Sequence, residues 1–385
     1  MKILVIHNAY GIYGGEEAVV DFQTEAFRKA GHEVILYRKE SSELYANGFR
    51  GKIEAFFSSF YNRKAIRELE RVIADRSPDV AIVHNLFPVI SPAVLPHIKK
   101  AGVPIVMILH NYRMACPNAR FFTKGKICEK CLGGMKELNC VINDCENSFF
   151  KSVCYALRNF WARSRGYFDA VDVFVALTDF QKRKLSAAGL DENKIKIIPN
   201  SIDITTQPIA GEAQCREYVG YVGRISQEKG IGVLIEAARR LPEVPFRVAG
   251  KISDGTVLAD LPPNVTLCGP LGREQLPEFY SNARIMVMTS VWYECFPMVL
   301  LEAMLYRTPV IAPRLGGIPE IIEDGYNGLL FRAGDGVDLA RRTGSLWNDR
   351  AQGEIYAANG YEKVLKYYSS DIYLEDMLHQ FASLK

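Results

Sequence analysis

The sequence predicts an α/β protein built from two doubly wound parallel-sheet domains. Apolar, strand-like runs alternate with helix-like segments along the whole 385-residue chain. The strand-like runs are almost continuously apolar, which is typical of parallel strands that helices cover on both faces. A polar stretch at 201–216 interrupts the alternation once, so it indicates a linker between two domains of similar size.

Each domain is predicted to contain six strands with helices between them. We place the first domain at 1–203 and the second at 204–365, and we expect a last helix, 366–385, to cross back to the first domain. The expected strands lie at 2–8, 33–39, 79–85, 104–111, 172–178, 195–200, 217–224, 246–250, 265–269, 284–290, 308–313 and 328–331, and the clearest helices at 16–31, 91–102 and 231–241.

Composition limits the class of protein. Hydrophobic residues make up 48% of the chain and charged residues 24%, which is ordinary for a soluble globular protein. The first apolar run, MKILVIHN, is too short for a signal peptide, so we expect a cytoplasmic protein. The net charge of +3 comes with no broad basic field, and no nucleic-acid partner is expected.

One segment, 49–64, combines bases with aromatic residues in the run FRGKIEAFFSSFYNRK. This combination is typical of an amphipathic segment at a membrane surface, which would place the protein at the inner face of the membrane. A helix that simply covers the core explains the segment equally well, so peripheral membrane contact stays one of two interpretations.

Two glutamates, Glu294 and Glu302, lie in the run SVWYECFPMVLLEAM. The run follows the strand 284–290 and is predicted to become a helix near 296–306, with Pro297 in its first turn. A strand–loop–helix unit of this kind aims free backbone N–H groups at a phosphate. The two carboxylates suit a ligand with hydroxyl groups at both ends, although solvated surface glutamates are the alternative.

Two cations and two glycines also lie in loops between a predicted strand and the helix that follows it. Arg224 leaves the end of a strand and Lys229 begins the next helix, so together they could neutralise a diphosphate, unless they form an ordinary basic turn. Gly14 and Gly15 follow the first strand, where they permit close approach of a ligand to the backbone. Their loop lacks the GxGxxG pattern, which disfavours a nicotinamide dehydrogenase.

His110 ends the strand 104–111 and is placed for hydrogen bonding or proton handling. His7 and His84 also end strands, so a structural role for any one of the three is an equal alternative. The segments PNSID (199–203) and GGIPEII (316–322) offer backbone donors or tight connections, the second with a helix starting near Ile318.

A cysteine-rich insertion, at about 112–152, interrupts the first domain and is too long for an ordinary loop. Because thiols in a reducing compartment hold zinc more often than they form disulfides, the insertion predicts a structural zinc site, with buried free thiols as the alternative. The candidate ligands are Cys116, Cys128, Cys131, and Cys140 or Cys145.

Taken in order, these motifs resemble the GT-B glycosyltransferases, specifically the retaining group often called glycosyltransferase family 4. The resemblance is strong from about Glu217 to Phe331, through GYVGRISQEKG, FRVAG, VTLCGPL, YECFPMVLLEAML, TPVIAPRLGGIPEII and DGYNGLLF. It is thinner over the first half, where GGEE, ILHN, ALT and PNSID follow one another.

The resemblance implies a role for each candidate residue. Glu294, His110, Arg224 and Lys229 form the implied catalytic set. The two cations would hold the donor diphosphate, Glu302 the ribose, Glu294 the transferred sugar, and His110 the region of the anomeric carbon. The implied donor contacts also include Gly14, Gly15, Gly250, Lys251, Leu271, Phe296, Pro297, Met298 and Val299.

The implied reaction is front-face transfer through an oxocarbenium-like transition state, in which the departing phosphate accepts the proton of the acceptor. Positioning and charge stabilisation then supply the catalysis, and no catalytic metal or cofactor is expected. The main prediction is a retaining transferase that moves a sugar from a UDP- or GDP-sugar to a glycan, glycolipid or lipid-linked acceptor in surface polysaccharide biosynthesis. The alternatives are an epimerase or hydrolase of the same fold, or a non-catalytic sugar-nucleotide-binding protein.

Overall fold

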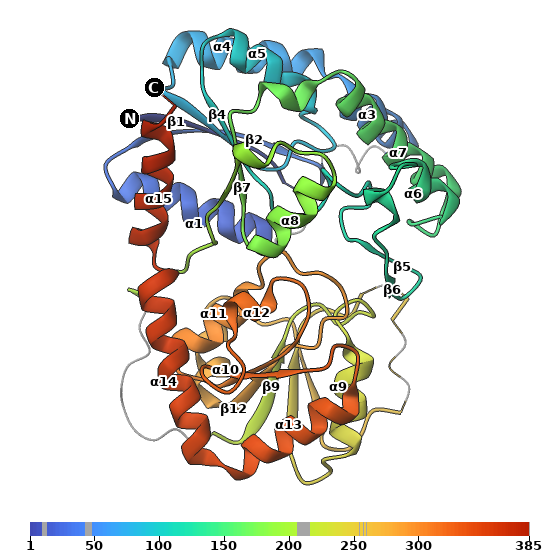
Figure 1. Ribbon diagram of the computed structural model, residues 1–385, viewed down its shortest axis with the longest axis vertical. Coiled ribbons are helices and arrows are strands. Elements are labelled where there is room, and N and C mark those ends of the chain that lie inside the picture. Colours follow the sequence, from blue (N-terminus) through green and yellow to red (C-terminus); the bar gives the residue numbers. More distant parts are fainter. Residues whose placement is uncertain are drawn as a thin grey trace. The chain divides into compact units, whose positions relative to one another are not determined.

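The computed structural model divides into two compact units, each with its own parallel sheet (Figure 1). The first unit comprises Met1–Thr123, Cys128–Asn200 and Tyr373–Lys385, and the second comprises Lys124–Ile127 and Ser201–Ile372. The structure describes residues 1–9, 14–42, 48–205, 216–253, 255–256, 258 and 260–384, with the side chains of Phe49, Arg50 and Lys52 left out.

The first unit contains a six-stranded parallel sheet in the order β2-β1-β3-β4-β7-β8. Its central strands are buried on both faces, as the continuous apolar runs predicted; Ile3, Leu4, Val5 and Ile6 of β1 are at most 1% exposed. The strands are β1 (Lys2–Ala9), β2 (Glu33–Glu40), β3 (Val80–Val83), β4 (Ile105–Ile108), β7 (Val173–Ala176) and β8 (Ile195–Ile197).

Helices separate these strands, as doubly wound connections require. The predicted helix at 91–102 is a short 3-10 turn followed by an α-helix. The helices are α1 (Gly15–Lys29), α3 (Gly48–Phe60), α4 (Arg63–Arg76), α5 (Leu95–Lys100), α6 (Leu138–Ile142), α7 (Phe149–Ser164) and α8 (Asp179–Ala187). The end of the chain, in α15 (Ser370–Ala382), packs on α1 through the rings of Tyr373 and Phe381 against Phe27.

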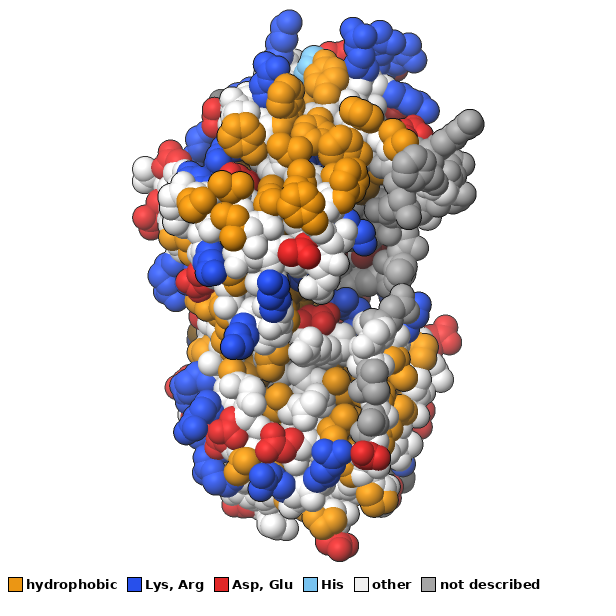
Figure 2. Space-filling model, turned by 90° about the vertical axis from the view of Figure 1, so that its right-hand side faces the viewer, with side chains coloured by type: hydrophobic (Ala, Val, Ile, Leu, Met, Phe, Trp, Pro, Cys, Tyr) orange, Lys and Arg blue, Asp and Glu red, His pale blue; other side chains and the backbone are white. Residues whose placement is uncertain are grey.

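The insertion of the first domain folds into small elements that precede α7. The strands β5 (Phe122–Thr123) and β6 (Lys126–Ile127) form a separate two-stranded sheet, and α6 packs against α7 through Cys140, Cys145 and Ala156. Apolar side chains gather on the face of the first unit that carries α3, α6 and α7 (Figure 2). None of the described helices combines the length and the apolar character needed to cross a membrane.

The second unit repeats the architecture in the order β11-β10-β9-β12-β13-β14. The strands are β9 (Tyr218–Val222), β10 (Phe246–Ala249), β11 (Val265–Gly269), β12 (Ala283–Val287), β13 (Val310–Pro313) and β14 (Leu329–Phe331). The helices are α9 (Ile231–Arg239), α10 (Leu276–Asn282), α11 (Met298–Leu305), α12 (Ile318–Ile321), α13 (Gly336–Asn348) and α14 (Arg350–Tyr367). The predicted fold class is thus confirmed for both sheets.

Each sheet has one point at which the strand order reverses. In the first unit this point lies between β1 and β3, and in the second it lies between β9 and β12. Ligands of doubly wound sheets bind beyond the carboxyl ends of the strands at such a point, because the two flanking connections leave the sheet in opposite directions. The residues that follow these four strands are therefore the first candidates for a functional site.

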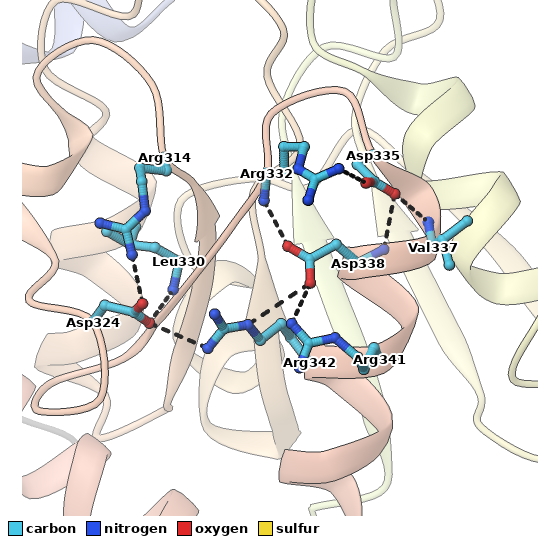
Figure 3. A network of polar contacts seen from close by, with 9 residues as sticks. All are labelled: Arg314, Asp324, Leu330, Arg332, Asp335, Val337, Asp338, Arg341 and Arg342. Atoms are coloured by element: carbon cyan, nitrogen blue, oxygen red, sulfur yellow. Dashed lines mark hydrogen bonds and ion pairs between the residues drawn. The ribbon is translucent and has the colours of Figure 1, made fainter.

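A polar network fixes the connection from β13 through α12 and β14 to α13 (Figure 3). Asp324 accepts hydrogen bonds from Arg314 Nη2 (2.5 Å) and from the backbone N–H of Leu330 (2.9 Å). Asp335 caps α13 by accepting from the backbone N–H groups of Val337 (3.0 Å) and Asp338 (2.9 Å). The aspartates thus replace backbone partners that a helix start and an edge strand lack.

We expect Asp335→Ala to lower the free energy of unfolding of the second unit by about 1 kcal/mol, because it removes the cap of α13. Urea unfolding measures this loss. Arg332→Ala is the matched control, since Arg332 is 81% exposed and lies 3.4 Å from the Asp335 carboxylate. An equal loss in both variants would assign the effect to the surface ion pair, which should contribute less than about 1 kcal/mol.

Candidate functional site

The loop after β9 is held against the loop after β12 at the reversal point of the second sheet. Gly230 adopts a φ of +74°, and a Cβ added there would lie 1.8 Å from the carbonyl oxygen of Thr289. The Thr289 hydroxyl donates to the carbonyl oxygen of Lys229 (2.8 Å), and the Val291 N–H donates to that of Glu228 (3.0 Å). Only glycine fits at position 230, so the close approach of the two loops depends on this residue.

This approach brings Lys229 and Glu294 together. Lys229 Nζ lies 2.7 Å from Glu294 Oε1, and the same oxygen accepts from Ser290 Oγ (2.6 Å) and Trp292 Nε1 (2.8 Å). Burial alone would raise the pKa of Glu294, but the Lys229 ammonium and these hydrogen bonds hold it below its usual value. Glu294 is therefore an ionised carboxylate that is only 9% exposed. The sequence did not single out Ser290 and Trp292, although both stand in the same run as Glu294.

Arg224 is the more accessible cation. Its side chain is 57% exposed and lies 3.2 Å from the Glu228 carboxylate. Its carbonyl oxygen accepts from the Tyr221 hydroxyl (2.8 Å), which fixes the backbone at the end of β9. The guanidinium can therefore turn toward a ligand without disturbing the strand.

Glu302 lies on α11 and is bonded to the Tyr280 hydroxyl. Burial raises the pKa of Glu302, while the Tyr280 hydrogen bond and the Arg273 charge offset part of that rise. Pro297 is the N-cap of α11 rather than a residue of its first turn, because the helix begins at Met298 and not at Phe296. Glu302 is consequently about one helical turn inside the helix.

The other predicted donor contacts lie along the same edge of the second sheet. Gly250 directly follows β10, and a Cβ added there would lie 1.8 Å from the Gly223 carbonyl oxygen. The Ile225 N–H donates to the Lys251 carbonyl oxygen (2.9 Å), so the segments after β9 and β10 run side by side. Leu271 follows β11 at this edge.

In the first unit, three histidines meet near the carboxyl ends of their strands: His84 and His110 follow β3 and β4, and His7 lies within the last residues of β1. His84 Nδ1 lies 2.8 Å from His110 Nε2 with the rings stacked, and His7 stands edge-on to His84 at 6.0 Å. Burial lowers the pKa of His110 to about 3, with a smaller contribution from His7, and burial together with the Arg38 charge lowers the pKa of His7 to about 4. The imidazole of His110 is therefore neutral at neutral pH, so it can exchange hydrogen bonds but carries no charge.

His110 also lines a small cavity of about 30 Å³, room for about one water molecule. Four further polar residues of this cavity were not among the predicted site residues: Glu16, Asn85, Asn111 and Arg113. Burial raises the pKa of Glu16 to about 8, against the opposing charge of Arg113, so this carboxyl is protonated at neutral pH. The sequence held a signal for Asn85 and Arg113, because each follows a strand-ending histidine by three residues or fewer.

A larger cavity of about 430 Å³ shares Phe87, Arg113, Met114 and Phe168 with the small one. Its other lining residues include both charges and aromatic rings, among them Lys136, Arg163, Asp169, Phe174 and Asp191. This volume is typical of a site for a small organic ligand.

The predicted glycine loop is described only in part. Gly14 donates its N–H to Glu17 Oε2 (3.1 Å), which closes the first turn of α1, and Gly15 is exposed with open space around it. Tyr10, Gly11, Ile12 and Tyr13 lie outside the described residues. Gly15 thus offers the freer approach to a ligand.

The cysteines of the insertion meet as two thiol pairs. Cys131 donates to Cys116 and lowers its pKa, and Cys140 donates to Cys145 and lowers its pKa to about 7. Cys128 is half-buried, and no group of three or more His, Cys, Asp or Glu side chains in the described ranges has the arrangement of a metal site. The structural zinc stays a prediction.

Comparison with known proteins adds family evidence. Residues 216–349 match the family Glycosyl transferases group 1, and residues 13–206 match Glycosyltransferase Family 4. D-inositol 3-phosphate glycosyltransferase of Mycobacterium sp. (strain JLS) is 30% identical over 199 residues, 46% of this chain and 45% of that protein. An uncharacterized 42.6 kDa protein in the cps region of Klebsiella pneumoniae is 26% identical over 353 residues, 83% of this chain and 87% of that protein.

Several of the curated relatives are matched over only about half of their own length. Among solved structures, Anabaena Alr3699/HepE in complex with UDP superposes with a TM-score of 0.67 at 18% identity, and each chain is covered completely. At that identity the likeness establishes the fold alone, which agrees with the GT-B expectation.

The neutral His110 makes stability depend on pH. Its pKa is about 3 in the folded chain and 6.5 when unperturbed, so its contribution is complete above about pH 6.5 and is lost as the pH falls below that value. When the pH falls from 7 to 5, protonation of this histidine in the unfolded chain lowers the free energy of unfolding by about 2 kcal/mol. We expect His110→Gln to reduce the loss by that amount, measured by hydrogen exchange of the β4 amides. His379→Gln, at an exposed histidine, is the control, and an equal loss in both variants would contradict a buried neutral His110.

Proposed function

Because the chain belongs to glycosyltransferase family 4, matched at residues 13–206, and also matches group 1 glycosyl transferases at residues 216–349, we propose that it transfers a sugar from a nucleotide-sugar donor with retention of configuration. The observation that carries the proposal is the ion pair of Lys229 and Glu294 at the reversal point of the second sheet. A cation and an ionised acid at that place suit a ligand that carries both phosphate and hydroxyl groups.

The donor diphosphate is assigned to Lys229 and Arg224. The Lys229 ammonium has three N–H donors, of which Glu294 takes one, so donors are left for phosphate oxygens. Arg224 adds an exposed guanidinium that can bind two oxygens at once. Together they would neutralise the charge that develops on the leaving diphosphate, the largest electrostatic demand of the reaction.

The hydroxyl groups of the donor are assigned to the two glutamates. Glu294 would accept from the transferred sugar, because it stays ionised and its position is fixed by Ser290 and Trp292. Glu302 would accept from the ribose, with the Tyr280 hydroxyl holding the carboxyl in place. The N–H groups at the start of α11, from Met298 and Val299, would face the diphosphate.

The acceptor side is assigned to the first unit. Its 430 Å³ cavity adjoins the small cavity of His110 and contains both charged and aromatic groups, which suits a glycan or a lipid-linked glycan. Neutral His110 would hydrogen-bond a hydroxyl near the reacting carbon without adding charge. A relative from a cps region supports a role in surface polysaccharide biosynthesis.

A thermal-shift panel of UDP, GDP, ADP and their sugars tests the donor assignment. UDP leads the panel because a protein of the same fold has been solved with UDP bound. We expect one nucleotide to raise the melting temperature selectively, and the same nucleotide-sugar to support transfer with the anomeric configuration kept, as read by NMR. Release of free sugar or an epimerised donor as the only product would contradict a transferase, and an inverted linkage would contradict retention.

We expect Lys229→Ala and Glu302→Ala each to reduce turnover by at least ~100-fold, because each removes a contact to the donor. Lys366→Ala and Glu278→Ala are the matched controls, since both residues are exposed elsewhere on the second unit. Steady-state rates with the donor found in the panel measure the effect, and melting curves confirm that each variant is folded. Full activity of either site variant would refute the donor assignment.

A further inference from the structure

The first unit exposes an unusual number of large apolar side chains on three neighbouring helices. All four phenylalanines that are exposed in the described part of the chain belong to α3 or α7, and Phe149 and Phe150 are 69% and 75% exposed. We define the apolar patch by Phe57, Leu138, Ile142, Phe149, Phe150 and Phe160. Figure 2 shows hydrophobic side chains gathered on the face that carries these helices.

The pattern of α7 explains why the patch is continuous. Phe149, Val153, Leu157 and Phe160 follow one another at helical spacing, so they share one side of the helix, and three of the four are exposed. Arg158 and Ala162, on the opposite side of the helix, are buried. A helix that only covers a core turns a polar face to water, and α7 does the reverse.

The neighbouring helices extend the same surface. Phe60 of α3 packs against Trp161 of α7, with the ring centroids 6.3 Å apart, and Phe57 points outward one turn before Phe60. On α6, Cys140 is fully buried, while Leu138 and Ile142 are 51% and 61% exposed. Other side chains thus make the contacts between the helices, and the side chains of the patch remain exposed to solvent.

The segment of sequence that contains α6 and α7 has a net positive charge. The segment 120–165 carries nine Lys and Arg against four Asp and Glu, a net charge of +5, whereas the remainder of the chain has a net charge of −2. Helix α7 itself contains no acidic residue, and Lys151 is exposed directly beside Phe150. Arg158 is buried, and Arg120 and Arg163 pair with Glu146 and Glu137. Exposed aromatic side chains next to an exposed lysine, in a segment of net positive charge, complement an anionic lipid surface.

We propose that this patch inserts into the interface of an anionic lipid bilayer and holds the protein at the membrane surface. Phenylalanines at the end of α7 would enter the boundary between headgroups and acyl chains, while Lys151 and its neighbours meet lipid phosphates. The inference extends the membrane contact that the sequence suggested for 49–64 to a surface centred on α7. It does not depend on the identity of the sugar donor.

Vesicle flotation of the full chain tests this proposal. We expect binding to vesicles of 70% phosphatidylcholine and 30% phosphatidylglycerol, and markedly less binding to pure phosphatidylcholine or at 0.5 M salt. Phe149→Ser combined with Phe150→Ser should weaken binding at least ~10-fold, because the two rings supply much of the inserted area. Lys151→Glu should selectively weaken binding to the anionic vesicles.

The matched control is Ile355→Ser combined with Tyr367→Ser, since these side chains are 53% and 50% exposed on α14. This variant should bind vesicles as the unmodified chain does, and both double variants should keep the nucleotide-induced shift in melting temperature. Failure of the unmodified chain to float, or equal binding by the phenylalanine variant, would overturn the proposal. Sedimentation that shows a dimer abolished by the phenylalanine substitutions, without vesicle binding, would assign the patch to a second copy of the chain.

Discussion

The ion pair between Lys229 and Glu294 is the interaction on which the second unit's site depends. A carboxylate that is 9% exposed is costly to leave unpaired, and here one oxygen receives an ammonium, a hydroxyl and an indole N–H. The pair forms only because Gly230 allows the loops after β9 and β12 to approach. The backbone constraint and the electrostatic one therefore support each other, and a change in either loop would affect both.

The two units differ in the charge state of the ionisable groups near the ends of their strands. In the second unit, hydrogen bonds and a cation keep Glu294 charged despite burial. In the first unit, burial keeps His110 and His7 neutral and leaves Glu16 protonated. This contrast fits the proposed division of roles, because a diphosphate needs fixed charge, whereas acceptor hydroxyl groups need neutral hydrogen-bonding partners.

The fold could be predicted from sequence because buried parallel strands impose a strong apolar signal on the chain. The candidate residues of the second unit, Arg224, Lys229, Glu294 and Glu302, could be singled out from one continuous stretch of motifs, and their roles stay predictions. The cavity of the first unit was harder to predict. Glu16, Asn85 and Arg113 come from three separate connections, and only the tertiary structure brings them together.

Local sequence patterns left two details undecided: the first residue of α11 and the arrangement of the cysteines in the insertion. Proline lacks a backbone N–H, which neither the N-cap nor the first turn of a helix needs, so the sequence alone could not decide where α11 begins. The cysteine insertion posed the same kind of ambiguity, because spacing cannot distinguish a ligand set from paired thiols. Its folded form settles where these side chains point: Cys140 and Cys145 pack inward against α7, and Leu138 and Ile142 are left on the outside. The burial of these two cysteines orients the short helix α6 so that Leu138 and Ile142 extend the apolar surface of α7.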